Sequence, residues 1–161
     1  MMEKVQQVSQ LLRDLRAMES CQYAIGVRIR FANPTLVYHS YPMAWIEEYD
    51  RLGLRFQDPT VRWGMTTTGI IRWSELVAQD AAGVFTRAAD HGLRYGLGVS
   101  VGAPESRTLG FFARSDRELD ASETAQASRL ITGLHETTEG LELESQQTLH
   151  ALRILNDTAS A

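Results

Sequence analysis

Hydrophobic and polar residues follow two different periods along the chain, one typical of helices and one of strands. From Val5 to Met18 apolar side chains recur every three or four residues, which predicts an amphipathic helix. From Tyr23 to Phe31 apolar residues alternate, in the second half with arginines, which predicts a strand with one buried face. Asn33-Pro34 is typical of a turn, so residues 36–39 are expected to form the returning strand of a hairpin.

The middle of the chain has mainly helical patterns. Residues 42–52 begin with a proline, which suits the first turn of a helix, and end before a glycine. Asp58 precedes another proline and has the position of an N-cap. Residues 66–69 form a polar break. The alanine-rich residues 78–91 are expected to form one helix that Gly92 ends.

The last third of the chain predicts two more strands and two more helices. Residues 97–101 and 108–113 are the expected strands. Asp120 and Glu123 have the spacing of a capping box that opens a helix, and a final polar helix is expected over residues 142–156. Because hairpins and helices are segregated along the chain, we predict an α+β fold, an antiparallel sheet of four to five strands with helices on its faces.

Composition and charge narrow the class of protein. The 161 residues suit one domain, and 16 Lys and Arg against 20 Asp and Glu give a net charge of −4. Such a surface repels phosphate backbones, so we do not expect the chain alone to bind DNA or RNA. The single cysteine, Cys21, excludes an internal disulfide and fits a reducing cytoplasm. No segment has the pattern of a signal peptide or membrane span, so we expect a cytoplasmic protein with no membrane partner.

Catalytic and metal-binding patterns are absent from the sequence. The four histidines are scattered, and no HExxH motif or cysteine pair occurs, so we expect no metal and no cofactor. Cys21 lies between a predicted helix and strand, where a lone cysteine usually packs rather than reacts. The glycines between 92 and 102 do not have the spacing of a dinucleotide-binding loop. We therefore expect a protein that is not an enzyme.

One aromatic segment instead suggests a binding pocket. Tyr41, Trp45 and Tyr49 are spaced by four residues, so they lie along one helix face. This stripe is either ordinary core or the wall of a pocket, and Asp58 is either a helix N-cap or a buried acceptor. Tyrosine and tryptophan donate hydrogen bonds, and a buried carboxylate needs donors. Together these side chains suit a small, neutral, amphipathic ligand with carbonyls, an amide N–H and an apolar tail.

The same residues resemble a known family, the autoinducer-binding domain of LuxR-type quorum-sensing regulators. The likeness covers most of residues 1–140, which we take as the binding domain, and it implies a three-layer α-β-α sandwich around an antiparallel sheet of about five strands. We take residues 141–161 as a linker helix or the start of a DNA-binding domain. The motifs that carry the resemblance are Trp45-x3-Tyr49, Asp58-Pro59-Thr60, Trp73, Gly92-Leu93, Tyr95-Gly96 and Leu109-Gly110.

The resemblance also implies a ligand and roles for the site residues. The ligand would be an N-acyl homoserine lactone, with Trp45 donating to the lactone carbonyl and Tyr41 to the acyl carbonyl. Asp58 would accept from the ligand amide. The remaining members of the site would form its walls and one further contact: Tyr49, Trp73 and Thr60.

Several positions depart from the family pattern. Two common prolines are replaced by Ile70 and Ser100, and a small hydroxyl residue that helps to bind the acyl carbonyl is replaced by Ala113. The missing hydroxyl puts a preference for 3-oxo chains in doubt. Whichever of Phe111 and Phe112 points inward would shorten or bend the tail pocket.

Two functions from different classes follow from the sequence. The first is the ligand-binding sensor of a quorum-sensing transcription regulator, acting as a homodimer. The alternative is a ligand-free interaction module that forms a heterodimer with a full-length regulator and inhibits it, because the helix-turn-helix domain typical of the family is not recognisable here. A pocket filled by Phe111, Phe112 and Trp63 would favour the module, whereas an open cavity would favour the sensor. A lactone-hydrolysing enzyme is the third and weakest reading.

Overall fold

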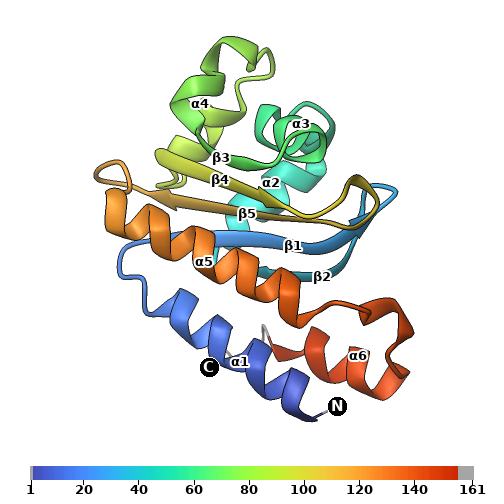
Figure 1. The fold of residues 1–161 in the computed structure, drawn as a ribbon. Coiled ribbons are helices and arrows are strands. Elements are labelled where there is room, and N and C mark those ends of the chain that lie inside the picture. The colour runs from blue at the N-terminus through green and yellow to red at the C-terminus, as the bar shows by residue number, and fades with distance from the viewer. Residues whose placement is uncertain (1, 156–161) are drawn as a thin grey trace.

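An antiparallel sheet divides the molecule into two helical layers (Figure 1). The computed structural model describes residues 2–155, and within them the sheet has five strands in the order β2-β1-β5-β4-β3. This confirms the predicted three-layer sandwich. The strands are β1 (Gln22–Arg30), β2 (Asn33–His39), β3 (Gly69–Arg72), β4 (Tyr95–Val101) and β5 (Arg107–Arg114).

The two layers are built from helices of different length. One layer contains α1 (Met2–Arg16), α5 (Ala121–Thr137) and α6 (Gln146–Arg153), and we call the sheet face beneath it the helix face. The other layer contains α2 (Met43–Arg51), α3 (Pro59–Thr66) and α4 (Val84–Ala89), and we call the sheet face beneath it the pocket face. Short 3-10 turns complete the description: η1 (Leu54–Phe56), η2 (Trp73–Gln79), η3 (Pro104–Ser106) and η4 (Leu141–Leu143).

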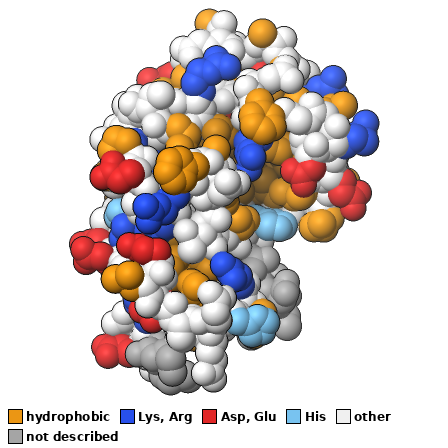
Figure 2. Space-filling view, turned by 90° about the vertical axis from the view of Figure 1, so that its right-hand side faces the viewer, with side chains coloured by type: hydrophobic (Ala, Val, Ile, Leu, Met, Phe, Trp, Pro, Cys, Tyr) orange, Lys and Arg blue, Asp and Glu red, His pale blue; other side chains and the backbone are white. Residues whose placement is uncertain are grey.

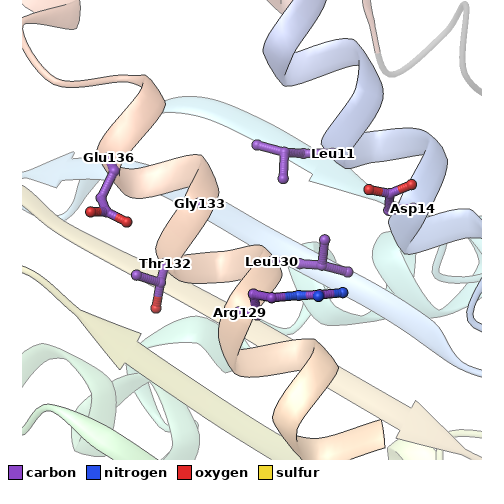
Figure 3. A pocket seen from close by; sticks show the side chains of 7 residues that line it. All are labelled: Leu11, Asp14, Arg129, Leu130, Thr132, Gly133 and Glu136. Atoms are coloured by element: carbon purple, nitrogen blue, oxygen red, sulfur yellow. The ribbon is translucent and has the colours of Figure 1, made fainter.

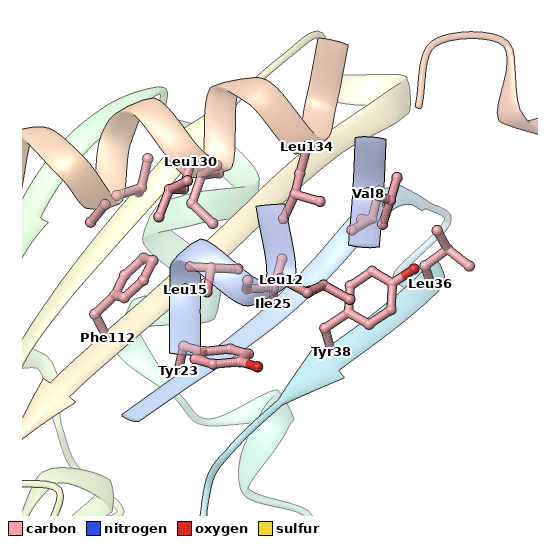
Figure 4. Packing of buried hydrophobic residues seen from close by; sticks show 14 of the residues in the cluster. Val8, Leu12, Leu15, Tyr23, Ile25, Leu36, Tyr38, Phe112, Leu130 and Leu134 are labelled. Atoms are coloured by element: carbon pink, nitrogen blue, oxygen red, sulfur yellow. The ribbon is translucent and has the colours of Figure 1, made fainter. Parts of the chain in front are cut away.

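The helix face carries the larger hydrophobic core (Figure 4). Leu12 of α1 and Leu134 of α5 pack with Ile25 and Phe112 of the sheet, and all four are almost completely buried. Helix α6 belongs to the same core, because its Leu149 and Leu152 are buried there. The Tyr38 hydroxyl of β2 donates to the Leu152 carbonyl oxygen over 2.8 Å. Residues 156–161 of the segment that we took as a linker lie outside the described residues.

A bulge in β1 changes the face to which its side chains point. The pairing with β5 shifts register between Gly26 and Ile29, and Arg28 has a φ of 52°. Val27 therefore packs on the helix face, whereas Ile29 lies on the pocket face. The predicted alternation breaks here. Phe31, expected at the end of the buried row, is 93% exposed.

The structure also differs from other predicted elements. Strand β3 was not predicted, and the single helix expected over residues 142–156 is divided into η4 and α6. The turn of the first hairpin is Phe31-Ala32, with φ values of 52° and 68°, rather than Asn33-Pro34, which already belongs to β2. Residues 78–91 do not form one helix, because the Asp80 carboxylate accepts from the backbone N–H groups of residues 84 and 85 and starts α4 there. Gly92 ends that region with a φ of 85°, as predicted. Among the described residues, no helix is both long and apolar enough to cross a membrane.

Candidate ligand-binding site

A cavity of about 450 Å³ lies between the pocket face of the sheet and the short helices. Its walls come from β1, β2 and β5 on one side and from α2, η1, α3 and α4 on the other. All six site residues predicted from the sequence line it: Tyr41, Trp45, Tyr49, Asp58, Thr60 and Trp73. Residues that are far apart in the sequence are thus brought together in one apolar space.

A second hollow, on the opposite side of the sheet, has a different character (Figure 3). It is a groove of about 480 Å³ between α1 and α5 with charged side chains at its edges, among them Asp14, Arg129 and Glu136. None of the predicted site residues lines this groove. The pocket face is therefore the candidate site.

Asp58 combines the two roles that its sequence left open. Its Oδ1 caps α3 by accepting from the Thr60 backbone N–H at 2.9 Å and from the Thr60 hydroxyl at 2.7 Å. Its Oδ2 accepts from the Tyr49 hydroxyl at 2.9 Å. Burial raises the pKa of Asp58, and the hydrogen bonds from Thr60 and Tyr49 oppose that shift. Since an ionised carboxylate has about four acceptor sites, Oδ2 retains one for a ligand donor.

Trp45 and Tyr49 lie on α2, whereas Tyr41 precedes the helix, so the predicted three-residue helix face is wrong at Tyr41. The three aromatic residues nevertheless contribute both to the core and to the pocket wall. The Trp45 ring packs edge-on against Tyr49 with centroids 5.5 Å apart, and against His91 at 5.4 Å. His91 Nε2 lies 3.0 Å from Glu48 Oε1, which holds the imidazole against the indole. The sequence did not single out His91, because it comes from the segment after α4 and nothing in its neighbours points to Trp45.

Two buried donors in this site have no partner. The Tyr41 hydroxyl and the Trp73 indole Nε1 are buried and make no hydrogen bond within the described part of the chain. Burial raises the pKa of Tyr41 well above its ordinary value, and nearby Asp58 raises it further, so the hydroxyl keeps its proton. An unsatisfied buried donor costs about 1–3 kcal/mol, so an acceptor delivered by a ligand would relieve that cost.

The sheet supplies a further wall of the cavity. Gly26 and Ile29 of β1 and Leu109 of β5, which the sequence did not place in the pocket, line it together with Phe111 of β5. Strand alternation answers the question of the two phenylalanines, since Phe111 faces the cavity whereas Phe112 is buried in the helix-face core. Alternation alone could have separated Phe111 from Phe112, although not which one faces the cavity.

The positions that depart from the family pattern have their own structural roles. The Ser100 hydroxyl donates to the Gly64 carbonyl oxygen at 2.7 Å and lies 3.2 Å from Arg107 Nη1. Arg107 Nη1 also donates to the carbonyl oxygens of Gly64 and Thr67, so this pair satisfies the C-terminal end of α3. Ile70 is half-exposed on the edge strand β3. Ala113 is fully buried with the pocket-face aromatics and offers no hydroxyl.

Comparison with known proteins decides the family. A family model described as the autoinducer binding domain matches residues 4–137. The chain belongs to this family. The relatives of this chain are LuxR-type quorum-sensing regulators, which agrees with the resemblance seen in the sequence.

The relatives of this autoinducer-binding domain are longer transcription regulators. It is 32% identical over 95 residues to the transcriptional activator protein SolR of Ralstonia nicotianae, which covers 58% of this chain and 40% of SolR. The chain thus spans about two fifths of the curated relatives that it matches.

Two solved structures share the fold. The first is SdiA of Escherichia coli in complex with octanoyl-rac-glycerol, with a TM-score of 0.63 and 20% identity over 86% of this chain and 60% of SdiA. The second is the N-acylhomoserine-lactone-dependent factor CepR2 of Burkholderia cenocepacia, with a TM-score of 0.54 and 19% identity over 74% of this chain and 72% of CepR2.

Proposed function

We propose that this autoinducer-binding domain is the cytoplasmic sensor part of a transcription regulator and binds an N-acyl homoserine lactone in the pocket-face cavity. The observation that carries the proposal is that one apolar cavity is lined by two polar groups able to bind a ligand. The Tyr41 hydroxyl is a buried donor without a partner, and the Asp58 carboxylate has a free acceptor site. A secondary amide matches this pair, since its carbonyl accepts and its N–H donates.

The remaining polar groups suit the rest of such a ligand. The Trp45 indole would donate to the lactone carbonyl, and Tyr49 and Trp73 would enclose the ring. Thr60 holds Asp58 in place through two hydrogen bonds, which makes it a positioning residue. Because Ala113 replaces the hydroxyl residue that the family pattern has at this position, we expect an unsubstituted chain to bind at least as well as a 3-oxo chain.

The ligands named for the two solved structures support this class of ligand. CepR2 depends on an N-acylhomoserine lactone, and the SdiA structure holds an octanoyl chain on a glycerol. Both ligands join a polar head to an apolar acyl chain, which is the polarity that this cavity offers. We expect this domain to act as part of a dimer, in which another part of the regulator contacts DNA.

The cavity also bears on the ligand-free interaction module. Phe112 points away from the cavity, and Trp63 lies against Gly98 rather than in the cavity wall. Only Phe111 of the three aromatics expected to fill it reaches the space. An open cavity favours the sensor over the module.

Thermal unfolding with a panel of acyl homoserine lactones tests the proposal. We expect a dose-dependent rise in the melting temperature, since a ligand at one hundred times its Kd stabilises the folded state by about 2.7 kcal/mol. Trp45→Phe and Asp58→Asn should each weaken binding about tenfold or more, because each removes or alters a hydrogen bond to the head group.

Matched variants separate binding from folding. Trp63→Phe makes the same change outside the cavity wall, and Asp120→Asn alters the N-cap of α5 as Asp58→Asn alters that of α3. Both controls should bind as the wild type does. Unchanged affinity in Trp45→Phe and Asp58→Asn would refute the assigned roles, and folded protein that binds no member of the panel would refute the proposed ligand class.

A further inference from the structure

One end of the cavity reaches the surface at the edge of the sheet. Val37 of β2 and Phe56 of η1 both line the cavity, yet they are 53% and 75% exposed. By contrast, Trp45 and Asp58, which line the same cavity, are at least nine-tenths buried. The polar head-group residues are thus enclosed, whereas part of the apolar wall continues into solvent.

The topology explains why this end is open. Strand β2 is at the edge of the sheet, and Val37 alternates with Leu36 and Tyr38, which are buried on the helix face. The hairpin that leads into β2 turns within two residues, so this connection is too short to cover the opening, although Ala32 of the turn lines the cavity. Across the gap, Leu54 anchors η1 in the pocket-face core while Phe56 projects outward.

The exposed residues that line this opening are apolar except for Asp50 and Arg55. Figure 2 shows hydrophobic side chains gathered around a hollow in the upper half of one face, with a Lys or Arg and a His side chain nearby. Arg55 also lines the cavity, and its guanidinium lies 5.2 Å from the centre of the Phe56 ring. Two acidic side chains among the described residues line the cavity, Asp50 and the buried Asp58. Exposed apolar surface that is continuous with a ligand cavity is typical of a binding groove.

We propose that the cavity is open-ended: an acyl chain too long to be enclosed passes between Val37 and Phe56, and its last methylenes lie across the edge strand β2. This inference rests on the proposed function, because it places the head group at Trp45 and Asp58. Each methylene buried inside the cavity strengthens binding about fourfold, and methylenes beyond the rim add little. The affinity therefore rises with chain length and then levels off, rather than passing through an optimum.

Calorimetric titration with unsubstituted acyl homoserine lactones, from butanoyl to tetradecanoyl, tests this geometry. In the wild type we expect the Kd to fall with length and then stay constant. Val37→Trp places an indole in the opening, so the tetradecanoyl ligand should lose at least tenfold in affinity while the butanoyl ligand changes less than twofold. Val77→Trp is the matched control, because Val77 is 58% exposed but does not line the cavity.

A second probe does not depend on a variant. A dodecanoyl homoserine lactone with a bulky fluorophore on its terminal carbon should bind the wild type. A soluble quencher should still reduce the fluorescence of the bound ligand, because the fluorophore lies outside the cavity. A wild-type affinity that drops for the longest chains, together with exclusion of the labelled ligand, would overturn the open-ended cavity and leave the proposed function intact. Folded protein that binds no chain length would overturn the proposed function, and this inference with it.

Discussion

The two faces of one sheet are stabilised in different ways. On the helix face, α1 and α5 are 15 and 17 residues long and bury continuous rows of leucines. On the pocket face, α2, α3 and α4 have only nine, eight and six residues and enclose a cavity. Helices this short are marginal by themselves, so they depend on caps and on what they contact. The helix face thus holds the domain together, and the pocket face is the part whose stability a ligand can change.

Truncating one side chain on each face should give the largest difference. Leu134 is completely buried in the helix-face core, so Leu134→Ala should lower the free energy of unfolding by about 2–5 kcal/mol. Val61 lines the cavity and already borders open space, so Val61→Ala should cost about 1 kcal/mol or less. Denaturant unfolding without ligand measures both values.

The same pair of variants should separate in binding. Leu134→Ala, where it still folds, should bind acyl chains like the wild type, whereas Val61→Ala should alter the affinity for long chains. Equal losses of stability in the two variants would show that the pocket face is packed as tightly as the helix face.

The sequence predicted the two faces unequally well. The long periodic helices were predictable because each buries one continuous stripe, and the capping box of Asp120 was confirmed by its hydrogen bonds with Glu123. The six site residues were predicted to share a pocket, and they do line one cavity. Their individual roles toward a ligand remain predictions.

The rest depended on tertiary contacts that no local pattern contains. The two-residue turn at Phe31-Ala32 follows from the pairing of β1 with β2, although neither residue favours a positive φ. The break in residues 78–91 comes from a side chain, Asp80, that caps a helix four residues later. His91 reaches Trp45 only after α4 has turned back toward α2.

Acid should act on the two faces in opposite directions. Burial and nearby Arg28 lower the pKa of His135 on α5, so the folded protein binds this proton less readily than the unfolded chain. The free energy of unfolding should therefore fall as the pH drops through the ordinary histidine value of 6.5. Burial raises the pKa of Asp58, so this group adds stability as the pH drops into the acid range, while ligand affinity is lost with its acceptor.

Two substitutions isolate these contributions. His135→Gln should flatten the decrease in stability near neutral pH, since glutamine can still bond the Thr108 hydroxyl that lies 2.7 Å from His135 Nδ1. Asp58→Asn should remove the acid-range loss of ligand affinity, although its binding is weaker throughout. Melting temperatures and titrations over a pH series measure both effects. A slope that survives in His135→Gln would place the acid-sensitive group elsewhere.

The smallest expected effect concerns the hairpin tip, which belongs to neither core. Ala32 has a φ of 68°, a conformation that costs an L-residue about 1–2 kcal/mol and glycine almost nothing. Because glycine also loses more backbone entropy on folding, Ala32→Gly should raise the free energy of unfolding by only about 0.5–1 kcal/mol. Ala103→Gly is the control, since Ala103 has a φ of −71° and gains nothing from glycine. If the tip is independent of both faces, the gain from Ala32→Gly should add to the loss from Leu134→Ala in the double variant. A gain that disappears in the double variant would show that the hairpin tip and the helix face are energetically coupled.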